Sequence, residues 1–117
     1  MDSSTTTLLI KALDCLSARS VATAQNIANA NTQGYRPLRV SFEQALADAA
    51  SRGDAAIQAV SPQIDSIPVG ARDGELRLDL ELATASTTAQ RYGGLIDVFD
   101  RQLQLQNLAI TGSSGRN

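Results

Sequence analysis

The stretch NIANANTQGY, residues 26–35, decides where the N-terminal helix of this chain ends. Asn and Gly adopt the left-handed backbone conformation that closes a helix C-terminus more easily than other residues do. Pro37 follows closely, and its ring biases Arg36 toward extended backbone and blocks an immediate return to helix. The stretch therefore predicts a helix that ends near residue 30, then a turn, then an extended segment.

Before this stretch, apolar and small side chains recur with alternating four- and three-residue spacing from about Leu8 to Ala30. Ser4–Thr7 offer several candidate N-cap side chains for this helix. Because a heptad seam is the face through which helices pair, the pattern predicts a long helix with a helical partner. The predicted seam consists of Leu9, Leu13, Leu16, Ser20, Thr23, Ile27 and Ala30.

After Pro37 the pattern changes to alternation, with apolar side chains at every second position over residues 38–42. This alternation predicts a short strand, and Ser41 is a candidate N-cap for a brief helix over residues 43–47. Residues 48–66 contain few bulky side chains. We therefore expect a flexible linker or a partly disordered loop there.

A turn is predicted at Asp73-Gly74, because this dipeptide is typical of tight turns between strands. Short apolar pairs flank it at residues 67–69 and 76–78, so a small β-hairpin is expected around it.

The C-terminal segment has the most regular pattern of the chain and predicts a helix over residues 78–111, with Asp79 as its N-cap. Gly93-Gly94 interrupts it and predicts a bend or a close backbone contact with a neighbour. The composition of residues 112–117 predicts a disordered tail. The predicted seam consists of Leu78, Leu82, Ala85, Ala89, Tyr92, Ile96, Phe99, Leu103, Gln106 and Ile110.

These segments predict an all-α fold in which two long terminal helices pair as a coiled-coil-like hairpin around an irregular middle segment. The organisation is residues 1–35 (helix and Asn-rich turn), 36–77 (irregular, extended and linker), 78–111 (helix) and 112–117 (tail). Two helices alone bury little surface, and small domains with thin cores are usually stabilised by disulfides, metals or oligomerisation. With a single Cys among 117 residues, oligomerisation is favoured.

The composition excludes several classes of chemistry. The chain has no His, which is the commonest general base and metal ligand, and Cys15 is its single cysteine. The 10 basic residues against 12 acidic ones form no basic block, so no nucleic-acid partner is expected. We expect no enzymatic activity, no cofactor, no metal site, no membrane span and no cleaved signal peptide.

The ten residues Asn26–Tyr35 resemble the signature of the bacterial flagellar rod and hook axial proteins, in which a helix runs into N-I-A-N-x-N-T-x-G-Y. The chain is most similar to the proximal rod subunit of that family. Gln33 stands where the family often has Pro, and Leu82 where it has Met. The supporting segments are Ala12-Leu13, Leu16–Arg19, Val40–Leu46, Asp73-Gly74, Asp79, Glu81–Ala83 and Arg91-Tyr92.

The resemblance implies a structural subunit of the flagellar basal-body rod in the periplasm, exported by the type III apparatus without signal cleavage. Such subunits polymerise through their terminal helices into a tube that conducts export and transmits torque. The implied partners are other copies of the chain, other rod subunits, the basal-body adaptor protein and the export gate. Another axial subunit, or a cytoplasmic two-helix adaptor or chaperone-like module, is the alternative.

Two groups of residues are the candidate functional sites. One is the family turn motif, whose Asn side chains are expected to satisfy backbone groups at the helix end: Asn26, Ile27, Ala28, Asn29, Asn31, Thr32, Gly34 and Tyr35. The other is the helix seam used for assembly: Leu9, Leu13, Leu16, Ile27, Leu82, Tyr92, Ile96, Phe99, Leu103 and Ile110.

Overall fold

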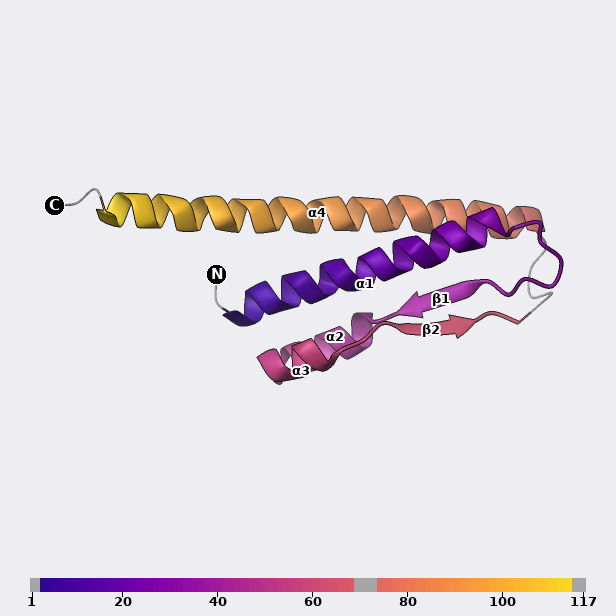
Figure 1. Ribbon diagram of the computed structural model, residues 1–117, viewed down its shortest axis with the longest axis horizontal. Helices are drawn as coiled ribbons and strands as arrows, with labels where there is room; N and C mark the ends of the chain where they lie inside the picture. Colours follow the sequence, from indigo (N-terminus) through magenta and orange to yellow (C-terminus); the bar gives the residue numbers. More distant parts are fainter. Residues whose placement is uncertain (1–2, 69–73, 115–117) are drawn as a thin grey trace.

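The computed structural model describes residues 3–68 and 74–114, with side chains described for 3–68 and 77–112. The chain is mostly helical, and its long N- and C-terminal helices are in contact, as predicted. The elements in chain order are α1 (Ser3–Ala28), β1 (Leu38–Ser41), α2 (Glu43–Ala50), α3 (Asp54–Ala59), β2 (Gln63–Ser66) and α4 (Gly74–Ser114) (Figure 1).

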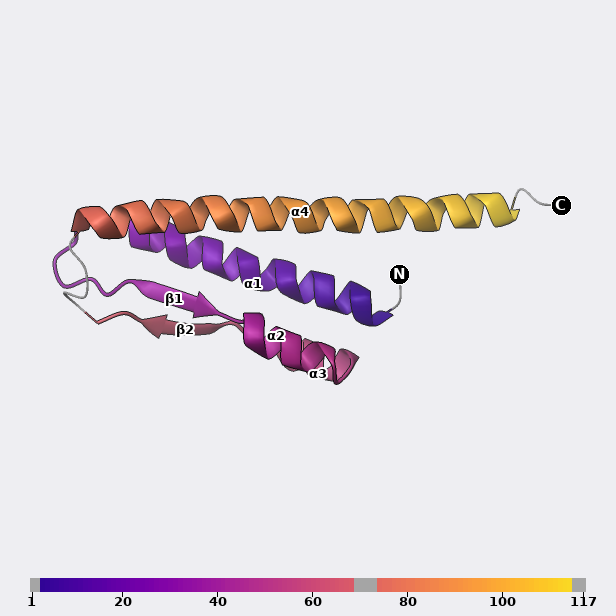
Figure 2. The ribbon, with the colours of Figure 1, turned by 180° about the vertical axis from the view of Figure 1, so that it is seen from behind.

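Helix α1 lies between α4 on one side and the β1–β2 ribbon with α2 and α3 on the other, a placement that both views share (Figures 1 and 2). The molecule is long and thin, with extents of 69 × 26 × 14 Å. No helix in the described part of the chain is both long enough and apolar enough to cross a membrane.

The main core lies between α1 and the middle segment, on the side of α1 away from most of α4. Ile57 on α3 and Val60 after it are buried there, as is Ala49 on α2. The prediction of a linker or loop over residues 48–66 is therefore wrong, because its few bulky side chains are the ones that pack on α1. The core cluster comprises Cys15, Leu16, Ala22, Val40, Phe42, Leu46, Ala49, Ile57 and Val60.

The two strands form an antiparallel ribbon with Leu38 opposite Ser66 and Ser41 opposite Gln63. The predicted strand after Pro37 is thus present, but its partner precedes Pro68. The hairpin predicted around Asp73-Gly74 is wrong in its second arm, since residues 76–78 belong to α4. They continue the helical pattern of that segment. Of the predicted turn, Gly74 is the first residue of α4, and Asp73 lies outside the described residues.

Several predicted helix boundaries are also wrong. Helix α1 begins at Ser3, so the Ser and Thr residues expected as caps lie inside it. The N-cap of α2 is Phe42, with no side-chain cap, rather than Ser41. Helix α4 begins at Gly74 and continues through Ser114, so the first residues of the expected tail are helical. Residues with weak helix propensity are incorporated because the helix is already nucleated.

Helix α4 runs through Gly93 and Gly94 without interruption (Figure 1). A Cβ atom built at either glycine meets nothing within 4 Å. Within the described part of one subunit, the glycine pair therefore makes neither the bend nor the close contact that its sequence predicts.

Replacing Gly93 and Gly94 together by Ala is expected to stabilise the isolated subunit by about 2 kcal/mol, because each Gly costs an exposed helix about 1 kcal/mol relative to Ala. Urea unfolding followed by far-UV circular dichroism measures this change. A destabilised double variant would contradict the open surroundings of the pair.

Candidate assembly surface and the turn that orients it

The buried side chain of Asn26, 1% exposed, connects three parts of the fold. Its amide nitrogen donates to the Leu38 carbonyl oxygen at 2.8 Å and to Oε2 of Glu81 at 3.1 Å. Its Oδ1 accepts from the Leu38 backbone N–H at 2.8 Å and from the Tyr35 hydroxyl at 2.9 Å. Both amide protons and both lone pairs of Asn26 are therefore used, which is what a buried amide requires.

The turn after α1 is held by its own polar side chains. The Asn29 amide donates to the Gln25 carbonyl oxygen at 2.9 Å, and the Thr32 hydroxyl donates to Oδ1 of Asn29 at 3.1 Å. The Tyr35 N–H then bonds to the Thr32 carbonyl oxygen at 3.2 Å. Gly34 has a φ of 80°, in the left-handed region that favours glycine.

The turn motif thus contains two groups with different roles. Asn26 and Tyr35 meet in the buried polar cluster around the Asn26 side chain, which we call the hub. Asn29, Thr32 and Gly34 shape the exposed turn. Two further predicted motif residues do not join either group: Ala28 and Asn31 are exposed, and no hydrogen bond of the described residues involves the Asn31 side chain. Ile27 is half-buried on α1.

Glu81 carries the hub across to α4, because its carboxylate accepts from Asn26. Burial raises the pKa of the Tyr35 hydroxyl, and the negative charge of Glu81 raises it further. The turn, strand β1 and the first part of α4 are therefore fixed relative to one another by one polar cluster. The sequence analysis gave Glu81 no role, although it lies in a segment of the resemblance.

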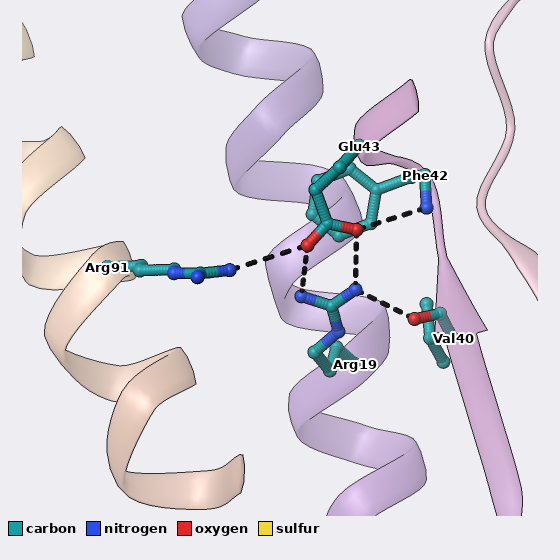
Figure 3. A network of polar contacts seen from close by, with 5 residues as sticks. All are labelled: Arg19, Val40, Phe42, Glu43 and Arg91. Carbon is teal, nitrogen blue, oxygen red and sulfur yellow. Dashed lines mark hydrogen bonds and ion pairs between the residues drawn. The ribbon is translucent and has the colours of Figure 1, made fainter. Parts of the chain in front are cut away.

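A second polar cluster ties α1, α2 and α4 together (Figure 3). The Arg19 guanidinium forms two 2.7 Å bonds to the Glu43 carboxylate and a third to the Val40 carbonyl oxygen. It also lies 4.7 Å from the centroid of the Phe42 ring, in cation–π geometry. Arg91 of α4 approaches the same carboxylate at 3.4 Å. The sequence analysis missed this cluster because its members are distant in the chain.

The hydrogen bonds from Arg19 lower the pKa of Glu43 from 4.5 to about 2. A carboxylate whose pKa falls on folding stabilises the native state above its unfolded pKa, and this contribution is lost as the pH falls through the folded value. Because the Glu43 side chain is 51% exposed, the contribution is at most about 1 kcal/mol.

Glu43→Gln is therefore expected to flatten the stability of the subunit between pH 5 and pH 2 relative to the parent chain. Urea midpoints measured across that range test it, with Asp97→Asn as a control that removes an exposed carboxylate of α4. Parallel pH profiles for the parent and Glu43→Gln would contradict the Arg19 contact.

The predicted seam on α1 contributes unequally to the fold. Leu9 and Leu16 are buried, and Leu13 is half-buried. Leu16 lines a small groove with Thr88 and Tyr92 of α4. Leu9 lines another with Leu95.

On α4, the face turned toward α1 differs from the predicted seam by one residue at every second position. Of the predicted residues, Leu78, Ala85 and Phe99 are partly buried, and Tyr92 is 41% exposed but lines a groove with Leu16. The other positions of the observed seam are Glu81, Thr88, Leu95 and Gln102, all partly or fully buried.

Five of the remaining predicted residues of α4 form a second stripe, spaced by seven, on the flank of the helix: Leu82, Ala89, Ile96, Leu103 and Ile110. The expectation that this stripe pairs with α1 is wrong where the polar side chains Glu81 and Thr88 occupy the contact instead, although Ala89 still lines a groove with Leu16. Leu82 is 51% exposed, Leu103 42% and Ile110 66%, and Ile96 is half-buried. These residues are available to a neighbouring molecule.

The C-terminal part of α4 extends well beyond the N-terminal end of α1 (Figures 1 and 2). From Leu103 to Gly112 every residue is exposed. We call residues 103–112 the overhang. Leu105 and Leu108 point away from the flank that carries Leu103 and Ile110, since a turn of about 100° per residue puts them about 140–160° around the helix from those two residues. Leu105 is 58% exposed and Leu108 68%.

Exposing apolar side chains on two opposite flanks of a helix to water is unfavourable, and such apolar patches mark interaction sites. The described residues contain no group of three potential metal ligands. Burial raises the pKa of the Cys15 thiol, which keeps it protonated and unreactive.

Comparison with known proteins adds no relative to this description: no protein-family model matches the chain, and no curated protein sequence matches it significantly.

Proposed function

We propose that this chain is a structural subunit of the bacterial flagellar basal-body rod, most similar to the proximal rod subunit, and that it polymerises through its terminal helices. The observation that carries the proposal is the overhang of α4, which exposes Leu103, Leu105, Leu108 and Ile110 on two flanks of one helix. A subunit that ends in such a helix needs neighbours on both sides to bury it.

The turn motif supports the same proposal from its chemistry. In the resemblance, Asn26 and Tyr35 belong to the family signature, and in the fold they meet at the buried hub. Arg19, Glu43, Glu81 and Arg91 lie in the supporting segments, and they form the two polar clusters that orient α4. The residues that carry the resemblance thus hold the overhang at a fixed angle to the rest of the subunit.

In this proposal the assembled helices form the wall of the axial tube that conducts export and transmits torque. The chain reaches the periplasmic rod through the type III export apparatus. Its partners are further copies, neighbouring rod subunits, the basal-body adaptor protein and the export gate, and it has no catalytic role.

The proposal is tested by deleting the gene in the source bacterium and examining purified hook–basal bodies by electron microscopy. We expect rods to be absent in the deletion strain and restored by the parent gene on a plasmid. Intact rods in the deletion strain, with the chain recovered as a monomer from the cytoplasm, would favour the adaptor or chaperone-like alternative.

A further inference from the structure

Helix α1 closes one edge of the β1–β2 ribbon with side chains. Asn26 donates to the Leu38 carbonyl oxygen and accepts from the Leu38 N–H, and Arg19 donates to the Val40 carbonyl oxygen. These bonds occupy three of the four backbone groups of Leu38 and Val40 that an added strand would use, and α1 itself covers this edge. Pairing with another strand is therefore blocked at this edge.

The same bonds define which backbone groups of β2 point outward. Since Leu38 and Val40 point toward α1, the bonded pairs of the antiparallel ladder are Arg39 with Asp65 and Ser41 with Gln63. The bond from the Ile67 N–H to the Pro37 carbonyl oxygen, at 2.7 Å, continues this alternation. In β2, the N–H and C=O groups of residues 64 and 66 consequently face the outer edge.

The outer edge of β2 is open to solvent. All four residues of β2 are exposed, and the Ile64 side chain is 53% exposed. In the described part of the chain, no hydrogen bond reaches the backbone N–H of Ile64 or Ser66 from outside the ribbon. An open edge with an exposed β-branched side chain is a template for pairing between copies.

Prolines stand at both ends of this edge, at the positions that would point outward. Pro62 and Pro68 have the same parity as Ile64 and Ser66, so each removes an N–H from the outer side and none from the ladder with β1. The edge therefore offers only two outward donors.

Two antiparallel copies of this edge have three compact ways to pair. A register centred on Ile64 places Ser66 opposite Pro62 of the other copy, and one centred on Ser66 places Ile64 opposite Pro68. Each of these loses bonds to a proline. The register that uses both donors of both copies is centred on Asp65, and it sets two Asp65 carboxylates directly opposite each other, which is destabilising.

We propose that Pro62, Asp65 and Pro68 together close the outer edge of β2 against pairing with a second copy of this chain. They keep free subunits from joining through their ribbons, whatever assembly the long helices make. The inference rests on the register of the ribbon and does not depend on the proposed function.

The test replaces Pro62, Asp65 and Pro68 together by Thr and follows the purified full chain by sedimentation equilibrium. The triple variant gains outward N–H groups and loses the carboxylate, so we expect its association constant to exceed that of the parent at least about tenfold. Slowed amide exchange at Ile64 and Ser66 in the associated form locates the contact. Adding Ile64→Pro, which removes an outward donor, is expected to reverse the gain.

The matched control carries Thr at Ser61, Gln63 and Ile67, which adds three threonines but neither an outward donor nor a lost carboxylate. Equal association of the triple variant and the parent, or equal gains in the triple variant and the control, overturns the proposal. If the triple variant fails to fold by circular dichroism, Pro68→Thr alone, at an exposed position, decides by the same comparison.

A second measurement tests directly which residues of β2 point their backbone N–H groups toward the outer edge. Ser66→Pro removes an outward N–H, and Asp65→Pro removes one bonded to β1. We expect Ser66→Pro to keep the denaturation midpoint of the parent and Asp65→Pro to lower it clearly. Equal loss in both variants would refute the assignment of the outer edge.

Discussion

Asn26→Asp is expected to lower the free energy of unfolding of the subunit by about 3 to 5 kcal/mol. The substitution keeps the shape of the side chain but replaces its NH₂ donor by an acceptor. That acceptor then faces the Leu38 carbonyl oxygen and the Glu81 carboxylate, which lie 2.8 and 3.1 Å from the present nitrogen. Urea unfolding at neutral pH measures the loss.

Asn31→Asp is the matched control, because Asn31 belongs to the same motif but is exposed. Its effect is expected to stay within about 0.5 kcal/mol. Adding Glu81→Gln to Asn26→Asp restores one donor at the buried carboxylate and is expected to recover part of the stability. Equal effects of Asn26→Asp and Asn31→Asp would contradict the role of the hub.

Leu105→Asp with Leu108→Asp is expected to abolish rod assembly while the isolated subunit stays folded. The two side chains are 58% and 68% exposed, so the subunit loses little packing. In an assembled wall they would be buried, and two buried unpaired charges cost several kcal/mol each. Complementation of the deletion strain, scored by motility and by rods in electron micrographs, measures the effect.

The control is Gln104→Asp with Asn107→Asp, which adds the same charge to the overhang without removing an apolar side chain. We expect this control to retain more assembly than the leucine variant. Normal rods in cells that carry the leucine variant would exclude the overhang as an assembly surface.

The turn after α1 could be predicted from the sequence because its determinants are local. Asn29, Thr32 and Gly34 act on backbone within a few residues, where propensity and turn chemistry decide. The reach of Asn26 to Leu38 and Glu81 could not be predicted, since it depends on how α1 meets β1 and α4. The sequence pattern does not specify how these three elements are placed relative to one another.

The middle segment was mispredicted because its helices are short and rich in Ala. The fully buried residues in and just after these helices form only two i, i+3 pairs, Leu46 with Ala49 and Ile57 with Val60. Two such pairs are too few to give a helical period. They become decisive only when α1 supplies a surface on which all four are buried.

The register of α4 was half predictable. Of the predicted seam, Tyr92 lines a groove with Leu16, and Leu78, Ala85 and Phe99 are partly buried. Hydropathy favoured Leu82 and the positions seven residues apart from it for the alternate positions. The contact with α1 uses Glu81 and Thr88 there: the Glu81 carboxylate accepts a hydrogen bond from the Asn26 amide, and Thr88 is buried. The exposed part of the apolar stripe on the flank of α4 is not covered within the described part of the subunit, so its role depends on neighbouring molecules that the sequence of one chain does not specify.

The central claim is that this chain is an axial subunit that becomes part of the rod. It is tested most directly by quantitative mass spectrometry of hook–basal bodies purified from the source bacterium. The account predicts peptides of this chain at a level comparable to those of other rod subunits. Absence of the chain from intact basal bodies, with the protein recovered from the cytoplasm, would contradict the account.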